Sequence, residues 1–158
     1  MFVFEKEQII HNIGGVKIGG SLGETPTVLA GTIFYGGHKI VEDTKKGIFD
    51  KKKATELVQK QDEMSDLTGN PSLVQIFAET SEAMIRYIDF VTDLTDSPFL
   101  IDSADYKARI SGLKHSEEIG LLDEAIYNSI NVFASTEELD ALEEIQHECA
   151  IILAFNPQ

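Results

Sequence analysis

Hydrophobic residues gather along the chain in five short runs that lack a strict alternation of apolar and polar positions. Uninterrupted apolar runs of this kind are typical of parallel strands that are buried on both faces. The predicted strands are Thr27–Tyr35, Leu73–Ala78, Phe99–Asp102, Ala125–Asn128 and Ala150–Phe155. Each of the first four is followed by a segment with helical spacing, so the pattern predicts a strict alternation of strands and helices.

Helix signals support this alternation. The predicted N-caps are Asp50, Thr80 and Ser135, the last in a capping box with Glu138. The first helix is expected from Lys51 to about Leu67, because Gly69 provides a stop. The positions expected to face the core are Ala54, Leu57, Val58 and Gln61 in the first helix, Met84, Tyr87, Ile88 and Val91 in the second, Tyr106, Ile110 and Leu113 in the third, and Leu139, Leu142 and Ile145 in the fourth.

Residues 1–26 form the predicted amino-terminal unit, ahead of a main domain at residues 27–158. This unit holds a short strand candidate at Phe2–Phe4 and then two apolar pieces separated by glycines, which favours a hairpin or cap. A phosphate-binding glycine loop would follow a strand and open a helix. The glycines from Gly14 to Gly23 instead precede a strand, so turn formation is the favoured interpretation.

Alternating strands and helices indicate an α/β fold with parallel strands and right-handed crossovers. Two architectures compete. A doubly wound five-stranded sheet would be complete at this length, whereas a (β/α)8 barrel of the TIM type needs about 250 residues. An apolar strand followed directly by Asn156-Pro157-Gln158 favours the first half of a barrel, because an open sheet usually adds a closing helix.

The composition narrows the possible functions. The 158 residues have a formal net charge of −14, and an acidic surface repels nucleic-acid phosphates and anionic lipids. No apolar run reaches the roughly 20 residues of a membrane helix, and the amino terminus lacks the long apolar region of a secretion signal. The single cysteine, Cys149, is typical of a reducing compartment. We therefore expect a cytoplasmic protein without direct membrane insertion, which is compatible with a peripheral position on a membrane complex.

Polar side chains end the third and fourth predicted strands. Asp102 follows the apolar run in PFLIDS, residues 98–103, and Asn128 follows it in AIYNSIN, residues 125–131. The carboxyl ends of neighbouring parallel strands are where α/β folds bind ligands. A carboxylate beside a carboxamide suits a flat heterocycle with amino and amide groups. Two other interpretations stay open here: Asp102 as the N-cap of a helix near Ala104, and Asn128 as a buried amide with partners inside the protein.

Other polar groups give weaker signals. The segment after the first strand contains four candidates, His38, Lys39, Glu42 and Asp43. A solvated surface loop is the favoured interpretation for them. His147 and Cys149 stand two residues apart without a second pair at zinc spacing, so no metal site is expected.

Longer motifs resemble one known family. The segments FEKEQ, GVKIGG, PTVLAGTIFYGGHKIVED, GIFD, EMSDLTGNPSLVQIF, YIDFV, PFLIDS, AIYNSIN and ILAFNP are similar to the H subunit of tetrahydromethanopterin S-methyltransferase. They are equally similar to bacterial relatives that take methyl groups to or from tetrahydrofolate. The resemblance covers nearly the entire chain. Because family members are about twice as long, it implies the amino-terminal half of a (β/α)8 pterin-binding barrel.

The resemblance also implies an activity. Family members move a methyl group between N5 of a methyl-tetrahydropterin and the cobalt of a corrinoid (cobalamin) held by a partner protein. Asp102 and Asn128 match the pterin-binding positions at the ends of the third and fourth strands. The residues expected to support them from nearby are Ser103, Ser129, Asn131 and Asn156. The catalytic group that polarises N5 is expected beyond residue 158, so this half alone is expected to be inactive.

The implied partners are a corrinoid protein or the other subunits of a methyltransferase complex, and a second copy of the full-length protein in a homodimer. An alternative hypothesis is that the chain is a non-catalytic half-barrel that acts only by assembly with another copy or a partner. Its basis is the open sheet edge that the fifth strand would leave, since unpaired strand edges are templates for further pairing.

Overall fold

A parallel sheet of five strands is the centre of the computed structural model, which describes residues 4–147 and 149–155. The strands are β3 (Leu29–Ile33), β6 (Ser72–Phe77), β7 (Phe99–Asp102), β8 (Ala125–Asn131) and β9 (Ala150–Leu153). All five predicted strands are thus confirmed, although β8 continues past its predicted end at Asn128 to Asn131, and β3 and β9 are shorter than predicted. The Phe2–Phe4 candidate is not, because residues 1–3 lie outside the described part and Phe4 is not in a strand.

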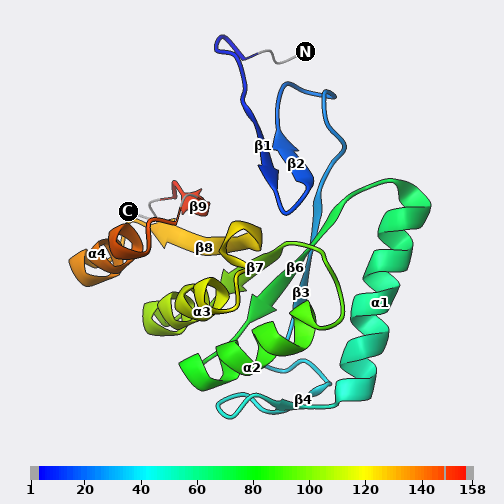
Figure 1. Ribbon diagram of the computed structural model, residues 1–158, viewed down its shortest axis with the longest axis vertical. Helices are drawn as coiled ribbons and strands as arrows, with labels where there is room; N and C mark the ends of the chain where they lie inside the picture. The colour runs from blue at the N-terminus through cyan, green and yellow to red at the C-terminus, as the bar shows by residue number, and fades with distance from the viewer. Residues whose placement is uncertain (1–3, 148, 156–158) are drawn as a thin grey trace.

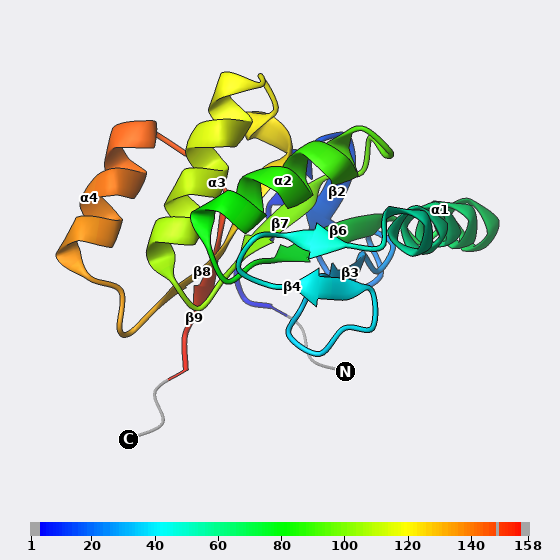
Figure 2. The ribbon, with the colours of Figure 1, turned by 90° about the horizontal axis from the view of Figure 1, so that it is seen from below.

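Strand order decides between the two predicted architectures. Each strand of the sheet pairs with the next one along the chain, in the order β3-β6-β7-β8-β9. A doubly wound sheet reverses its strand order at a switch point, and this sheet does not. Figures 1 and 2 show the helices together on the outer side of the sheet. The arrangement is consistent with half of a TIM-type barrel, as predicted.

Four α-helices alternate with the strands of the described chain. They are α1 (Lys51–Thr68), α2 (Ser81–Thr92), α3 (Tyr106–Glu118) and α4 (Thr136–Ile145), and a 3-10 turn, Leu122–Glu124, precedes β8. The predicted caps Asp50, Thr80 and Ser135 each accept a hydrogen bond from a backbone N–H of the first helical turn. Gly69 ends α1 at a φ of 70°, in the left-handed region that glycine adopts without a steric cost. No helix of the described residues is long and apolar enough to cross a membrane.

The main core lies between the sheet and the helices. The predicted α2 stripe of Met84, Tyr87, Ile88 and Val91 is fully buried there, against sheet residues such as Ile76 and Ile101. Burial raises the pKa of the Tyr87 phenol to about 12. Gly112 of α3 allows close packing, since a Cβ at this position would lie 2.8 Å from a side-chain carbon of Ile101.

Two predicted core positions are wrong. Leu57 is 46% exposed, because α1 lies at the edge of the sheet and buries only the narrow stripe of Ala54 and Val58. Leu139 is 45% exposed, because the inner stripe of α4 begins one residue earlier, at Glu138, and continues to Ile145.

The segment between β3 and α1 is more ordered than predicted. It contains an antiparallel pair of short strands, β4 (Val41–Asp43) and β5 (Ile48–Phe49). An aromatic cluster anchors this pair to the main core: the Phe34 ring stacks on Tyr87 with centroids 4.0 Å apart, and Phe49 contacts both rings.

The amino-terminal hairpin covers part of the inner face of the sheet. Strands β1 (Ile10–Ile13) and β2 (Val16–Gly19) pair antiparallel and confirm the predicted hairpin. A second core cluster joins Ile13 of the hairpin to Leu73, Leu100 and Ile126, which lie near the amino ends of β6, β7 and β8. The hairpin therefore covers the inner face at the amino ends of the strands, away from their carboxyl ends.

Candidate functional site

Asp102 and Asn128 lie side by side on two adjacent strands, where β7 ends and three residues before β8 ends at Asn131. Asp102 is the last residue of β7 and its Cα is the direct register partner of Asn128 in β8. Both side chains are half-buried, whereas their neighbours Ile101 and Tyr127 point into the helix-covered core. Because successive side chains of a strand alternate between faces, Asp102 and Asn128 lie on the inner face. The predicted pairing of a carboxylate with a carboxamide at one edge is therefore present.

The Asp102 carboxylate is held by a neighbouring strand. Gln75 of β6 donates from Nε2 to Oδ2 of Asp102 at 2.6 Å, and Thr32 of β3 donates from Oγ1 to Oε1 of Gln75 at 3.1 Å. Asp102 is not a helix cap, which removes that alternative. The N-cap of α3 is Asp105, whose carboxylate accepts from the backbone N–H of Lys107 at 2.9 Å.

The Asn128 amide has a different environment. Among the described residues no hydrogen bond is made by its side chain, so it is not the internally satisfied buried amide of the second alternative. The register of β8 against β9 shifts directly after it, between Asn128 and Ile130, and the peptide bond from Asn128 to Ser129 is cis. The donor and acceptor groups of the Asn128 amide are free to meet a ligand.

A cleft of about 280 Å³ joins these two residues. Three of the four supporting residues predicted from the sequence, Ser103, Ser129 and Asn131, also line it. Ser103 is buried and its hydroxyl accepts from the backbone N–H of Asp105 at 3.1 Å, while the Asn131 side chain accepts from the Phe133 N–H at 2.8 Å and forms a local turn. Asn156, the fourth, lies outside the described residues.

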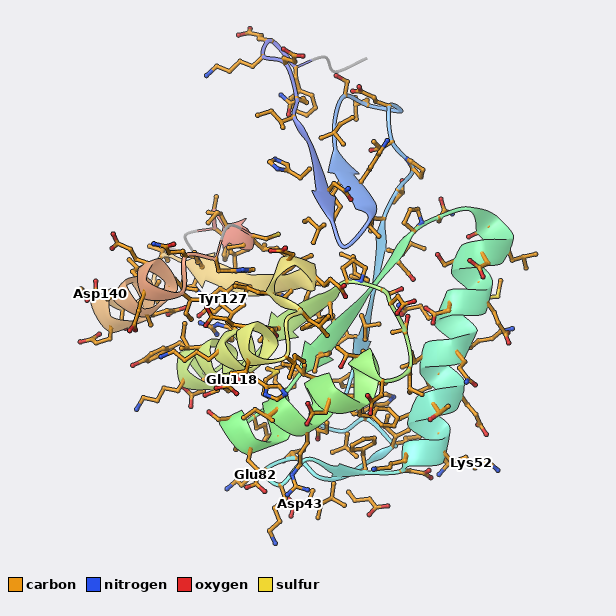
Figure 3. All side chains as sticks on the ribbon, in the orientation of Figure 1. Asp43, Lys52, Glu82, Glu118, Tyr127 and Asp140 are labelled. Carbon is orange, nitrogen blue, oxygen red and sulfur yellow. The ribbon has the colours of Figure 1, made fainter. Side chains whose placement is uncertain are left out.

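A buried ion pair that was not predicted lines part of this cleft. Arg109 of α3 donates from Nη2 to Oε1 of Glu138 in α4 at 2.6 Å, and the Tyr127 hydroxyl donates to the same oxygen at 2.6 Å. A second guanidinium nitrogen of Arg109 donates to the backbone carbonyl of Ser103. Tyr127 lies between β8 and the two helices (Figure 3). The network thus connects Ser103, which follows Asp102, with Tyr127, which precedes Asn128.

Charge in this network is stabilised by its internal contacts. Burial disfavours charge on Arg109, but its hydrogen bonds with Glu138 and Tyr127 hold the pKa of the guanidinium above its usual value. Burial, together with the hydrogen bond to Glu138, raises the pKa of the Tyr127 phenol. The capping box predicted from Ser135 and Glu138 is therefore only half formed. Ser135 accepts from the backbone N–H of Glu138, but the Glu138 carboxylate binds Arg109 and Tyr127 instead of the cap backbone.

The polar residues after β3 have local roles. His38 accepts from the backbone N–H of Phe34 at 3.2 Å, its ring stacks on Tyr35, and burial lowers its pKa. Asp43 accepts hydrogen bonds from the backbone N–H groups of Lys45 and Lys46 in its own turn. The hydrogen bond from Lys46 is the main cause that lowers the pKa of the Asp43 carboxyl group. Figure 3 shows Asp43 far from Tyr127. None of the four candidates of this segment lines the cleft, and two of them, Glu42 and Asp43, lie in strand β4 and not in the loop that was expected.

Metal-ligating side chains do not gather anywhere in the described chain. No group of three His, Cys, Asp or Glu side chains is close enough to hold a metal ion within residues 4–147 and 149–155.

The chain is related to a family of known proteins. Residues 6–158 match the family model described as tetrahydromethanopterin S-methyltransferase MtrH subunit. The chain is similar to proteins named as the H subunit of tetrahydromethanopterin S-methyltransferase in three organisms. It is 57% identical to that of Methanothermobacter thermautotrophicus over 99% of the chain and 51% of the relative. The corresponding values are 52%, 99% and 49% for Methanocaldococcus jannaschii and 51%, 96% and 47% for Methanopyrus kandleri. The chain spans about half the length of the curated relatives it matches.

Proposed function

Because the chain belongs to the family of tetrahydromethanopterin S-methyltransferase H subunits, we propose that Asp102 and Asn128 bind the pterin ring of a methyl-tetrahydropterin. The observation that supports this most directly is their register pairing at the rim of one cleft, with the Asn128 side chain free of hydrogen bonds to the described residues. The pterin is tetrahydromethanopterin or tetrahydrofolate, and the names of the relatives favour the former.

The chemistry of the two side chains fits the ring edge. A reduced pterin presents a ring N–H beside an exocyclic amino group, and the Asp102 carboxylate can accept hydrogen bonds from such donors, strengthened by its charge. Asn128 offers both a donor and an acceptor, so it complements a part of the ring where both are present. The described residues thus bind and orient the pterin.

The proposed reaction of the oriented pterin is transfer of its N5 methyl group. The acceptor substrate in this proposal is the cobalt of a reduced corrinoid carried by a partner protein, which attacks the N5 methyl group and takes it without its bonding electrons. The C–N5 bond breaks, its electron pair stays on N5, and N5 takes up a proton, which is a general-acid requirement. We assign that acid to no described residue. The name of the relatives as subunits supports assembly with other methyltransferase proteins, and we extend this to a homodimer of the longer protein.

The test uses the longer protein, because the catalytic group is expected beyond residue 158. It measures affinity for methyl-tetrahydromethanopterin and methyl-tetrahydrofolate, and the rate of methyl transfer to cob(I)alamin. Asn128→Asp keeps the shape of the side chain, removes its donor and places a second carboxylate opposite Asp102. We expect the affinity for the pterin to fall about 10-fold, or roughly 1.4 kcal/mol. Asn12→Asp, on the exposed surface of β1, makes the same change of charge and should leave the affinity unchanged. Equal affinity in the Asn128 variant and the wild type would contradict the proposed site.

A second function is favoured by the free edge of β9. Among the described residues β9 pairs only with β8, and all four of its residues are exposed, with Ile152 at 66%. Val132 and Phe155, which line a shallow pocket together with Ile152, are also exposed, at 57% and 64%. An apolar, unpaired edge supports the hypothesis that the chain acts by assembly with another copy or a partner strand.

Sedimentation velocity separates this second function from the first. Assembly predicts a sedimentation coefficient that rises with protein concentration, and Ile152→Lys should abolish the rise because charge on an edge strand opposes pairing. Leu22→Lys, at an exposed leucine of the amino-terminal loop, is the control and should still assemble. A monomer at every concentration tested would exclude assembly of identical copies.

A further inference from the structure

A row of hydrogen bonds crosses three strands on the inner face of the sheet. Thr32 of β3 and Gln75 of β6 are register partners, and the Gln75 side chain reaches from there toward the end of β7, where it contacts Asp102. In register, Asp102 stands opposite Phe77, two residues further along β6 than Gln75. Gln75 therefore contacts the carboxylate from below, on the side nearer the amino ends of the strands.

The two contacts of Gln75 determine which way its amide points. An ionised carboxylate only accepts hydrogen bonds, so the group facing Asp102 has to be the NH₂ of the amide. The amide oxygen then faces Thr32, whose hydroxyl donates to it at 3.1 Å. This orientation satisfies all three groups at once. The opposite orientation would put the amide oxygen against the carboxylate oxygen at 2.6 Å.

Resting on the proposed function, we propose that Gln75 is a positioning residue for the pterin. It holds Oδ2 of Asp102 and leaves Oδ1, which has no hydrogen-bond partner among the described residues, to accept from the ring. A neutral amide suits this role because it orients the carboxylate without neutralising it, whereas a lysine or arginine would compete with the ligand as an ion-pair partner. Thr32 acts one step further away, through Gln75.

The distinguishing experiment is a pH profile of pterin binding in Gln75→Glu. The introduced carboxyl group can still accept from Thr32, but it stands at hydrogen-bond distance from Asp102, and two carboxylates this close share a proton. With the proton present, the introduced carboxyl group donates to Asp102 as the amide did. We expect nearly wild-type affinity for methyl-tetrahydropterin at about pH 5.5 and an affinity about 10-fold lower at about pH 8. Each value is divided by that of the wild type at the same pH, which cancels the titration of the ligand and of other groups.

Two neutral variants complete the series. Gln75→Met keeps the length of the side chain and removes the donor, so its affinity should be about 5-fold lower at every pH. Thr32→Val removes only the hydroxyl that orients the amide and should cause a smaller, pH-independent loss. Gln61→Met is the matched control. Gln61 is also a half-buried glutamine, but it donates to the backbone carbonyl of Leu73 from α1, so its loss should lower stability and not affinity.

The outcomes are separable from those of the proposed function. If the wild type does not bind methyl-tetrahydropterin, the proposed function fails. If it binds and the Gln75→Glu ratio does not change with pH, Gln75 does not position Asp102. Should Gln75→Glu not fold, Gln75→Met decides: wild-type affinity in that variant overturns the proposal, and the expected loss with Gln61→Met unaffected supports it.

Discussion

Asp102→Asn is expected to lower the affinity of the protein for methyl-tetrahydropterin about 100-fold. The substitution keeps the size of the side chain but replaces one acceptor oxygen with an NH₂ donor. If that NH₂ faces the ring, it opposes the pterin donors, and if it faces Gln75, it opposes the Nε2 donor that now binds Oδ2 at 2.6 Å. A hydrogen bond to a charged group contributes about 1.5–3 kcal/mol, and the upper end corresponds to roughly 100-fold. Equilibrium titration with the methyl-pterin measures this loss.

The matched control for this variant is Asp105→Asn. It removes the same charge three residues away and keeps the N-cap of α3, because asparagine caps helices as well as aspartate does. Its affinity should equal that of the wild type. If both variants lose affinity equally, the effect belongs to the net charge of the region and not to contact between Asp102 and the ring. If neither does, Asp102 does not bind the ligand.

Glu138→Ala is expected to lower the free energy of unfolding by about 3–5 kcal/mol. Breaking a buried ion pair leaves the partner charge buried without compensation, and Arg109 is only 6% exposed. The Tyr127 hydroxyl loses its acceptor in the same variant. Because the network connects both sides of the cleft, the folded fraction should also bind the pterin less tightly. Urea denaturation of the two proteins under one buffer condition measures the difference.

Glu137→Ala is the control for this second variant. Glu137 precedes Glu138 in the first turn of α4 and is exposed, so its loss should cost less than about 1 kcal/mol, the usual size of a charge interaction with the helix N-terminus. If the free energy of unfolding falls no more in Glu138→Ala than in Glu137→Ala, the buried ion pair contributes little to stability. Replacing Arg109 and Glu138 together with apolar residues should recover part of the stability, since such pairs are often replaced at little cost.

The pairing of Asp102 with Asn128 was predictable because it follows from the sheet. Once Phe99–Asp102 and Ala125–Asn128 are recognised as consecutive parallel strands of equal length, Asp102 and Asn128 are expected side by side. The register confirms this pairing, although β8 itself continues to Asn131. The α2 stripe was predictable for a similar reason, since four apolar residues at helical spacing all lie on the same face of the helix.

Other features depend on contacts between distant segments. Arg109, Tyr127 and Glu138 come from α3, β8 and α4, and no local pattern indicates that they meet. The S-x-x-E pattern even predicted a different role for Glu138. A glutamate at this position can complete a capping box or form a buried ion pair, and the local sequence is the same in both cases. Strand β5 has two residues, too few for a periodic signal, and its order comes from Phe49 packing on Phe34.

The register of β7 and β8 also limits how such a site can change. Asp102 and Asn128 occupy directly paired positions, so the distance between their backbones is the interstrand spacing of about 4.8 Å. Backbone hydrogen bonds maintain that spacing whatever side chains the two positions have. Substitutions can therefore alter the charge, length or orientation of the two side chains of the proposed site, while the spacing between their backbones stays constant. Diversification toward larger or differently substituted heterocycles would have to use the surrounding loops or the depth of the cleft.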